Sequence, residues 1–272
     1  MRLTHRTGKS GKLATMKVRT LASVLVNGSK GSCRRLLVDE ALMNHFGAIV
    51  MAIRLTGATE VILIGDINQL PYIERNNLFE LQYCRPNQVT GISQELLCTH
   101  RNPMDVAYAL SEVYSGIYSS TSRIRSLKLK RYTDAQVPKT LEKTLYLVHT
   151  QAEKESLKKE GFGSGEGSRT LTIHEAQGQT YETVVIVRTS AKHLQLHDSV
   201  PHAVVAVSRH TISCTYYTDC SNDAIAQFIL RAMTATDERL EDYNISMAIR
   251  SGDSKVINKI TNRKLDVASG ND

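Results

Sequence analysis

The segment LLVDEALMNHFGAIVMAIRLTGATEVILIGD, residues 36–66, is the strongest indication of the fold class of this chain. The apolar run that ends at Val38, and a second run over residues 61–65, each have the composition of a buried strand. Between the two runs, apolar residues recur at helical spacing, and Gly57 suits the C-cap of that helix. Strand, helix and strand in this order predict a βαβ unit with parallel strands.

Both predicted strands stop at acidic residues: Asp39 and Glu40 follow the first strand, and Asp66 follows the second. Ligands of parallel sheets bind beyond the carboxyl ends of the strands, so we expect these three carboxylates at one edge. An apolar strand that ends in Asp-Glu has the form of a Walker B element. In such an element the first acid holds Mg²⁺ and the second orients the attacking water for phosphoryl transfer. The alternative is that Asp39 or Glu40 caps the following helix.

The chain beyond about residue 98 predicts a second α/β domain with another parallel sheet. Helices are expected from Asn102, as N-cap with Pro103 in the first turn, over residues 152–160, and from about Asn222, with Met233 facing inward. The glycine-rich segment 161–169 has the composition of a flexible linker, and the polar chain beyond about Ser251 is expected to fray. Strands are expected over residues 126–131, 144–150, 169–174, 183–188 and 202–209.

Three further motifs carry candidate site residues. In GDINQLPYI, Gln69 lies three residues after Asp66, where its amide could bond a γ-phosphate or the attacking water; a polar turn is the alternative. Thr172 is followed, after four residues, by Gln177 and Gly178. This spacing sets a hydroxyl and an amide beside a glycine that allows close backbone approach. Arg209 ends the predicted strand 202–209, as a finger on the γ-phosphate or as half of a structural ion pair.

Composition bounds the class of protein. The 272 residues contain 41% hydrophobic and 22% charged residues, which is typical of an ordered globular protein. No apolar run is long enough for a transmembrane helix, and the N-terminal residues lack the apolar centre of a secretory signal. Five scattered cysteines predict reduced thiols and a cytoplasmic location. The net charge of +7 permits a polyanionic partner such as RNA, or simply a basic solvated surface.

Two other groups of residues leave alternatives open. His193, His197 and His202 have spacing that a metal site can use, but solvated or RNA-adjacent histidines are the default. A basic stripe could follow a phosphate backbone or be a solvated strand face. The stripe consists of Arg123, Arg125, Lys128, Lys130 and Arg131.

The order of the motifs VDE, GDxxQLP, RNP, TxxxxQG and SRHT resembles motifs II to VI of the viral superfamily 1 RNA helicases. The resemblance is closest to the helicase domain of alphavirus-like replication proteins of the tobacco mosaic virus type, and covers residues 17–243. It implies an α/β fold of two RecA-like domains with parallel sheets, with NTP bound between them and RNA across both. The domains would be residues 1–97, truncated at the N-terminus, and 98–250, followed by a polar tail over residues 251–272.

The resemblance also implies roles for individual residues. At the nucleotide it implies Asp39 as the Mg²⁺ ligand, Glu40 as the catalytic base and Gln69 as the γ-phosphate sensor. Arg101 and Arg209 would be the catalytic arginines from the second domain. Further nucleotide-binding residues would be Asp66, Gln177 and Gly178. At the RNA it implies Arg19, Thr20, Thr172, His174, Ser208 and His210.

One expected element is missing. The tetrapeptide TGKS at residues 7–10 has the right end for a phosphate loop, but Leu3 stands where the pattern G-x-x-x-x-G-K-[ST] requires glycine. The chain therefore resembles a helicase core without its phosphate loop, as in a fragment, an incomplete gene model or a viral sequence captured in a host genome. The expected function is an NTP-dependent RNA helicase module of a positive-strand RNA virus replication protein, with ATP, Mg²⁺, RNA and other replicase domains as partners. The alternative is a catalytically inactive RNA- or protein-binding remnant.

Overall fold

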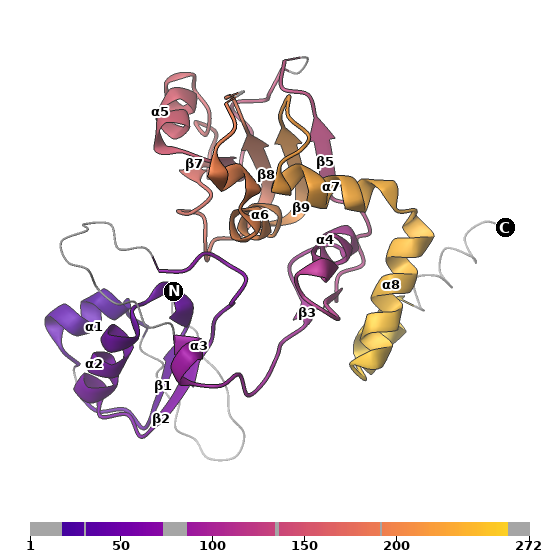
Figure 1. The fold of residues 1–272 in the computed structure, drawn as a ribbon. Helices are drawn as coiled ribbons and strands as arrows, with labels where there is room; N and C mark the ends of the chain where they lie inside the picture. The colour runs from indigo at the N-terminus through magenta and orange to yellow at the C-terminus, as the bar shows by residue number, and fades with distance from the viewer. Residues whose placement is uncertain (1–17, 30, 73–85, 134–135, 191, 261–272) are drawn as a thin grey trace. The chain divides into compact units, whose positions relative to one another are not determined.

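The computed structural model describes residues 18–29, 31–72, 86–133, 136–190 and 192–260 (Figure 1). They belong to two compact units. The first unit comprises Met1–Ile67 and Pro71–Ser93, and the second comprises Asn68–Leu70 and Gln94–Asp272. The domain limits drawn from the family resemblance stay predictions. Residues 1–17, which contain Leu3 and the TGKS tetrapeptide, and residues 73–85 lie outside the described residues.

The first unit contains the predicted βαβ arrangement. Strands β1 (Arg35–Val38) and β2 (Glu60–Leu63) pair in parallel, and α2 (Phe46–Thr56) connects them. Gly57 ends α2 with a left-handed φ of 61°, a conformation that costs glycine little because it has no Cβ. The helix begins later than the apolar spacing predicts, because a separate 3₁₀ helix (Ala41–Met43) follows β1.

The core of the first unit is small. Its buried hydrophobic cluster consists of Val38, Ala41 and Ile49. Leu37, expected in a buried strand, is 48% exposed. Two helices of this unit have no counterpart in the predictions: α1 (Leu21–Asn27), whose Leu21 packs on that core, and α3 (Pro86–Val89).

The second unit is built on a five-stranded parallel sheet, which confirms the predicted α/β class with parallel sheets. The strand order is β5-β9-β8-β6-β7. A separate parallel pair joins β3 (Cys98–Thr99) to β4 (Tyr118–Ser119). The five strands are β5 (Leu127–Lys130), β6 (Thr144–Val148), β7 (Arg169–Thr172), β8 (Tyr181–Val187) and β9 (His210–Tyr217).

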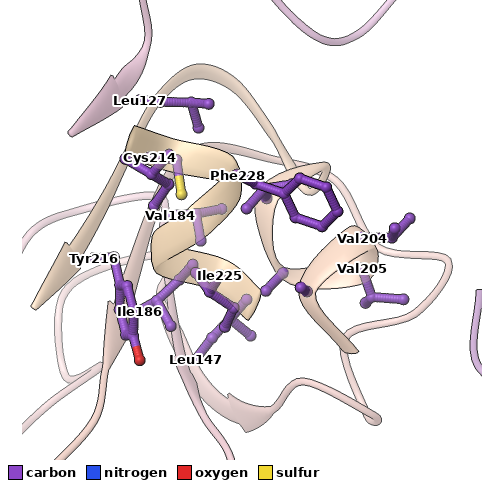
Figure 2. Close-up of a cluster of buried hydrophobic side chains, with 14 of the residues drawn as sticks. Leu127, Leu147, Val184, Ile186, Val204, Val205, Cys214, Tyr216, Ile225 and Phe228 are labelled. Atoms are coloured by element: carbon purple, nitrogen blue, oxygen red, sulfur yellow. The ribbon is translucent and has the colours of Figure 1, made fainter. Parts of the chain in front are cut away.

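Helices cover both faces of this sheet, so alternate residues of each central strand enter different cores. Leu145 and Leu147 of β6 pack with α6 and α7, whereas Tyr146 and Val148 pack with Leu157 of α5. Figure 2 shows the first of these cores, with Leu147, Val184 and Ile186 on the sheet side and Val204, Val205, Ile225 and Phe228 on the helices. The principal helices of this unit are α4 (Met104–Ala109), α5 (Gln151–Lys159), α6 (Val200–Val207), α7 (Ala224–Thr234) and α8 (Asp237–Arg250).

One predicted strand is wrong. The prediction gives a strand over residues 202–209, but α6 occupies Val200–Val207 and has Pro201 in its first turn. A short, wholly apolar run has no period that separates a buried strand from a buried helix, and its β-branched residues favour strand. Every residue from Ala203 to Val207 is buried, as in a helix that is apolar all round. The neighbouring strand is β9, which the prediction misses.

Further corrections concern element ends. Pro103, not Asn102, is the N-cap of α4, because the Asn102 side chain turns toward other carbonyl groups. Met233, expected to face inward, is 46% exposed. The chain does not fray at Ser251: residues 254–260 are helical, and Val256 and Ile260 are buried.

The glycine-rich segment 161–169 is a packed turn rather than a flexible linker. A Cβ added at Gly165 would clash with the backbone carbonyl oxygen of Leu141, so only glycine fits there. Backbone bonds from Gly163 to Lys139 and from Lys143 to Glu166 fix this turn against the preceding segment. Within the described residues, no helix is long and apolar enough to cross a membrane.

Candidate functional site

The carboxyl edge of the first unit carries the acidic residues expected there. Asp39 directly follows β1, is exposed, and accepts a hydrogen bond from the backbone N–H of Glu40 at 3.0 Å. Asp66 is half-buried and comes three residues after β2, which is parallel to β1. The strand ends therefore place Asp39 and Asp66 at one edge, where oxygen ligands suit a hard cation such as Mg²⁺.

Glu40 has an unusual backbone. Its φ of 49° and ψ of 44° lie in the left-handed region, which disfavours residues with a Cβ. The next residue is held in place, because the Ala41 N–H donates to the carbonyl of Ile64 at 2.8 Å. A strained residue that its surroundings fix is a pattern found at functional sites.

The capping alternative for these acids is wrong for α2. His45 is the N-cap of α2, and its Nδ1 accepts from the Gly47 N–H at 3.0 Å. Glu40 stands at the N-cap position of the 3₁₀ helix, but no side-chain cap bond forms there. Helix capping therefore does not explain the Asp-Glu pair.

The GDINQLP motif is divided between the two units. Asp66 belongs to the first unit, whereas Asn68, Gln69 and Leu70 group with the second. Leu70 is buried in the main core of the second unit, and the Asn68 amide approaches the Val113 carbonyl at 3.5 Å. Gln69, between Asn68 and Leu70 in the chain, is half-buried, and its role at a γ-phosphate stays a prediction.

In the second unit, the two predicted arginines come from segments that touch each other. The Arg101 guanidinium donates to the Ser208 carbonyl at 3.2 Å. The Asn102 amide donates to the carbonyls of Ser208 and His210, each at 3.0 Å. These hydrogen bonds hold the residues before α4 against the segment that connects α6 to β9. Sequence reasoning missed this bridging role of Asn102, although a polar residue between Arg101 and Pro103 is a signal.

The prediction places Arg209 at the carboxyl end of a strand, but in the structure it directly precedes the amino-terminal end of β9. It follows α6 and precedes β9, so it lies at the amino-terminal edge of the parallel sheet. The residue is 2% exposed, and its guanidinium donates to the Val205 carbonyl at 3.1 Å and to Ser208 Oγ at 2.7 Å. These bonds lie within its own unit. Whether Arg209 acts on a γ-phosphate stays a prediction.

His210 and Ser208 are buried. Nε2 of His210 lies 2.8 Å from Ser126 Oγ, and burial lowers the His210 pKa to about 3. A neutral, fully buried imidazole can position its neighbours but has no exposed surface for RNA. A direct contact of His210 with RNA would require this ring to become exposed, and stays a prediction.

The TxxxxQG motif forms the turn that follows β7. The Thr172 N–H donates to Glu175 Oε2 at 3.0 Å, and the Glu175 N–H donates to Thr172 Oγ1 at 3.3 Å. Partial burial opposes ionisation of Glu175, but hydrogen bonds from Lys154 and Thr172 outweigh it and lower the pKa to about 2. Gly178 has a φ of 77°, so the motif's glycine is required by backbone conformation.

This turn leads to the segment that carries Arg209. The Tyr181 N–H, at the start of β8, donates to the Arg209 carbonyl at 2.9 Å. Gln177 and Gly178 come just before Tyr181 in the chain, and His174 is half-buried within the turn. The roles of Thr172, His174, Gln177 and Gly178 at RNA or nucleotide stay predictions.

Arg19 and Thr20 shape the start of α1. Thr20 is its N-cap, and Thr20 Oγ1 accepts from the Ser23 N–H at 3.2 Å. The Arg19 guanidinium donates to the carbonyls of Ser23 and Gly28, each at 2.7 Å. These local bonds account for both residue types without a ligand, and an RNA role stays a prediction.

The three spaced histidines do not form a metal site in the part of the chain that the structure describes. His193 pairs with Asp198 at 2.7 Å, and His202 lies 2.8 Å from Ser199 Oγ. His197 is buried instead against the ring of His149, with ring centroids 4.5 Å apart. The solvated alternative is therefore also wrong for His197, which belongs to the core.

Comparisons with known proteins place the chain in a family. A model of the viral superfamily 1 RNA helicase core domain matches residues 2–218. The replication protein alpha-A of Barley stripe mosaic virus is 36% identical over 238 residues, covering 79% of this chain and 21% of that protein. The replicase large subunit of Tobacco mild green mosaic virus is 33% identical over 254 residues, covering 90% of this chain and 15% of that protein.

The chain thus spans about a fifth or less of the length of these relatives. The solved structure of the PRRSV helicase is 18% identical, with a TM-score of 0.49, over 80% of this chain and 42% of that one. The match over residues 2–218 covers most of the sequence. The chain belongs to the viral superfamily 1 RNA helicases, and carries the helicase core domain found in viral replicases.

Proposed function

We propose that this chain acts as the NTP-dependent RNA helicase module of a positive-strand RNA virus replication protein. The observation that carries the proposal is the helicase core match over residues 2–218. The finer parts of the proposal are two RecA-like domains, binding of ATP and RNA, contacts with other replicase domains, and a cytoplasmic location. Free thiols at Cys33, Cys98, Cys214 and Cys220 support that location.

Asp39 is proposed as the Mg²⁺ ligand. Its carboxylate is exposed, and Oδ1 accepts the backbone N–H of Glu40. A carboxylate has about four lone-pair sites, so this bond is compatible with coordination of a hard cation. Mg²⁺ bound there would neutralise charge on the phosphates of an NTP. Asp66 is proposed to support the same edge of the first unit.

Glu40 is proposed as the residue that orients the attacking water. Its backbone is held in the left-handed region by the Ala41 bond to Ile64, and this conformation sets the direction of the side chain relative to β1. The carboxylate makes no cap bond to either α2 or the 3₁₀ helix, so capping does not compete with a role as general base.

Arg101 and Arg209 are proposed as γ-phosphate contacts, with Gln69 as the sensor of that phosphate. Each arginine donates to a carbonyl of its own unit, and Arg209 also donates to a hydroxyl, which fixes the position of both side chains. A guanidinium carries five N–H donors in a planar fork that matches the geometry of a phosphate.

Nucleotide binding tests the proposal directly. We expect the chain to bind ATP more tightly with Mg²⁺ than with EDTA in isothermal titration calorimetry, and Asp39→Asn to remove this difference. Asp242→Asn removes the same charge from an exposed position of α8 and should leave the difference intact. Equal Mg²⁺ dependence in the wild type and Asp39→Asn would contradict the assignment of Asp39.

A second candidate function is that of an inactive RNA- or protein-binding remnant. The pattern G-x-x-x-x-G-K-[ST] is absent from the 272 residues, and without its lysine the phosphates lose their main cradle. We therefore expect slow ATP hydrolysis by this chain alone. RNA-stimulated turnover of about 1 s⁻¹ or more that Glu40→Gln abolishes would rule the remnant out.

A further inference from the structure

A pocket of about 640 Å³ lies at the amino-terminal edge of the second unit's sheet. The segment that links β4 to β5, together with His100, Thr211, Asp237 and Lys259, forms its walls. The volume lies in the range of ligand pockets, which is about 300–1,000 Å³. Of the helicase motifs, only the last residue of SRHT, Thr211, reaches this pocket. Two of its lining residues, Arg123 and Arg125, belong to the basic stripe.

The cations of this pocket fall into two kinds. Arg125 is structural: its guanidinium is paired with Asp237 at 2.6 Å and donates to the carbonyls of Ala232 and Ala235. Arg123 is exposed, and its guanidinium has no hydrogen bond or ion pair with any residue that the structure describes. Lys259 is exposed too, and donates to the Ser120 carbonyl at 3.0 Å. Since Arg125 neutralises Asp237, Arg123 and Lys259 leave the pocket with about two uncompensated positive charges.

Hydroxyl groups complete the donor set. Ser120, Thr121 and Ser122 follow one another along the wall. His100 Nδ1 lies 2.7 Å from Ser120 Oγ, which sets the imidazole beside these hydroxyls. Hydroxyl donors and cations, with the one acid neutralised, are the chemistry that recognises a phosphate oxyanion.

The backbone of the wall is fixed before any ligand arrives. The Met104 N–H donates to the Arg123 carbonyl, and the Asp105 N–H donates to the Ile124 carbonyl, each at 3.0 Å. The Ser120 N–H donates to the Thr99 carbonyl at 2.9 Å. A rigid backbone that presents a cationic side chain lowers the entropy cost of binding.

We propose that this pocket binds the phosphodiester backbone of a single-stranded RNA, as a contact additional to those of the predicted RNA-binding residues. The inference rests on the proposed RNA-binding function. None of the lining residues is Phe, Tyr, Asn or Gln, so the pocket offers no aromatic ring of these types for base stacking and no side-chain amide for base edges. The contact is therefore made to phosphates, and is independent of sequence and sensitive to salt.

The test measures binding of a fluorescent single-stranded RNA by anisotropy as a function of salt. Arg123→Ala with Lys259→Ala is expected to raise Kd by about tenfold or more at low salt. The slope of log affinity against log salt should become shallower by about 0.7 for each phosphate that the double variant no longer neutralises. Both side chains are exposed, so the double variant should keep the wild-type melting temperature.

Matched controls remove the same charges elsewhere. Arg169→Ala with Lys159→Ala changes exposed residues of the edge strand β7 and of α5, and should leave Kd within about twofold and the slope unchanged. An equal rise of Kd in the control and pocket variants would overturn the pocket, because general charge would then explain binding.

Two further outcomes separate the pocket from the proposed function. Wild-type RNA binding that the pocket variant retains in full overturns the pocket and leaves the helicase proposal standing, whereas a wild-type chain that binds no RNA overturns both. Titration with ATP and Mg²⁺ distinguishes the source of the phosphate. Unchanged ATP affinity in Arg123→Ala/Lys259→Ala supports the RNA strand, and weakened ATP affinity with unchanged RNA affinity overturns it.

Discussion

The buried ion pair between Arg188 and Asp223 is expected to be the most sensitive point of the second unit. Their side chains are 1% and 0% exposed, and Arg188 Nη1 lies 2.9 Å from Asp223 Oδ2. The same carboxylate accepts from the Tyr216 hydroxyl at 2.5 Å and from the Ala226 N–H at 2.8 Å, which caps α7. Asp223→Ala therefore removes an ion partner, a hydroxyl acceptor and a helix cap together.

The missing ion partner dominates the cost. Leaving a charge buried without its partner costs about 3–5 kcal/mol. A helix cap contributes about 1 kcal/mol, and an unsatisfied buried hydroxyl about 1–3 kcal/mol. These terms share one carboxylate and do not add in full. We therefore expect Asp223→Ala to lower the free energy of unfolding by about 4 kcal/mol.

Urea unfolding followed by far-ultraviolet circular dichroism and tyrosine fluorescence measures this change. The control Asp219→Ala removes an exposed carboxylate that accepts from Thr133, and should cost less than about 1 kcal/mol. Replacing both partners, Arg188→Met with Asp223→Leu, should restore much of the stability, because no unpaired charge remains. A cost of Asp223→Ala below about 1 kcal/mol, or equal to that of Asp219→Ala, would show that the buried ion pair does not stabilise the second unit as expected.

Two further predictions concern acid stability and backbone strain. Burial lowers the pKa of His149 and of His210 to about 3, so both fold as neutral rings. The unfolded chain takes up their protons below about pH 6.5, and each histidine should therefore lower the free energy of unfolding by up to about 1.4 kcal/mol per pH unit as pH falls from there toward 3. The difference between the urea midpoints at about pH 7.5 and pH 5 should be smaller in His149→Phe than in the wild type. In the exposed control His193→Phe, this difference should be at least as large as in the wild type. Glu40→Asn should raise the free energy of unfolding by up to about 1 kcal/mol, since asparagine tolerates the left-handed φ of 49° better. An equal gain from Glu60→Asn in the extended strand β2 would contradict the strain explanation.

Elements whose signals are local could be predicted from the sequence alone. The βαβ unit over residues 36–66 was predictable because its strands and helix have different periods and a glycine ends the helix. The motif order likewise identified the helicase family, which the core-domain match confirms. Strands β6, β7 and β8 were predictable as apolar or alternating runs between polar turns.

Contacts between segments far apart in the sequence determine whether a short apolar run becomes a helix or a strand, and which polar side chains meet. Ala203–Val207 is helical because it is buried on every side between the sheet and α7, a condition that lies far from it in sequence. Asn102 does not cap α4 as predicted, because its side-chain amide donates hydrogen bonds to the carbonyls of Ser208 and His210, more than a hundred residues away. Arg123 and Arg125 are equivalent members of one basic stripe in the sequence. Only the fold separates them, because it brings Asp237 and two carbonyls to the Arg125 guanidinium and, among the described residues, no such partner to that of Arg123.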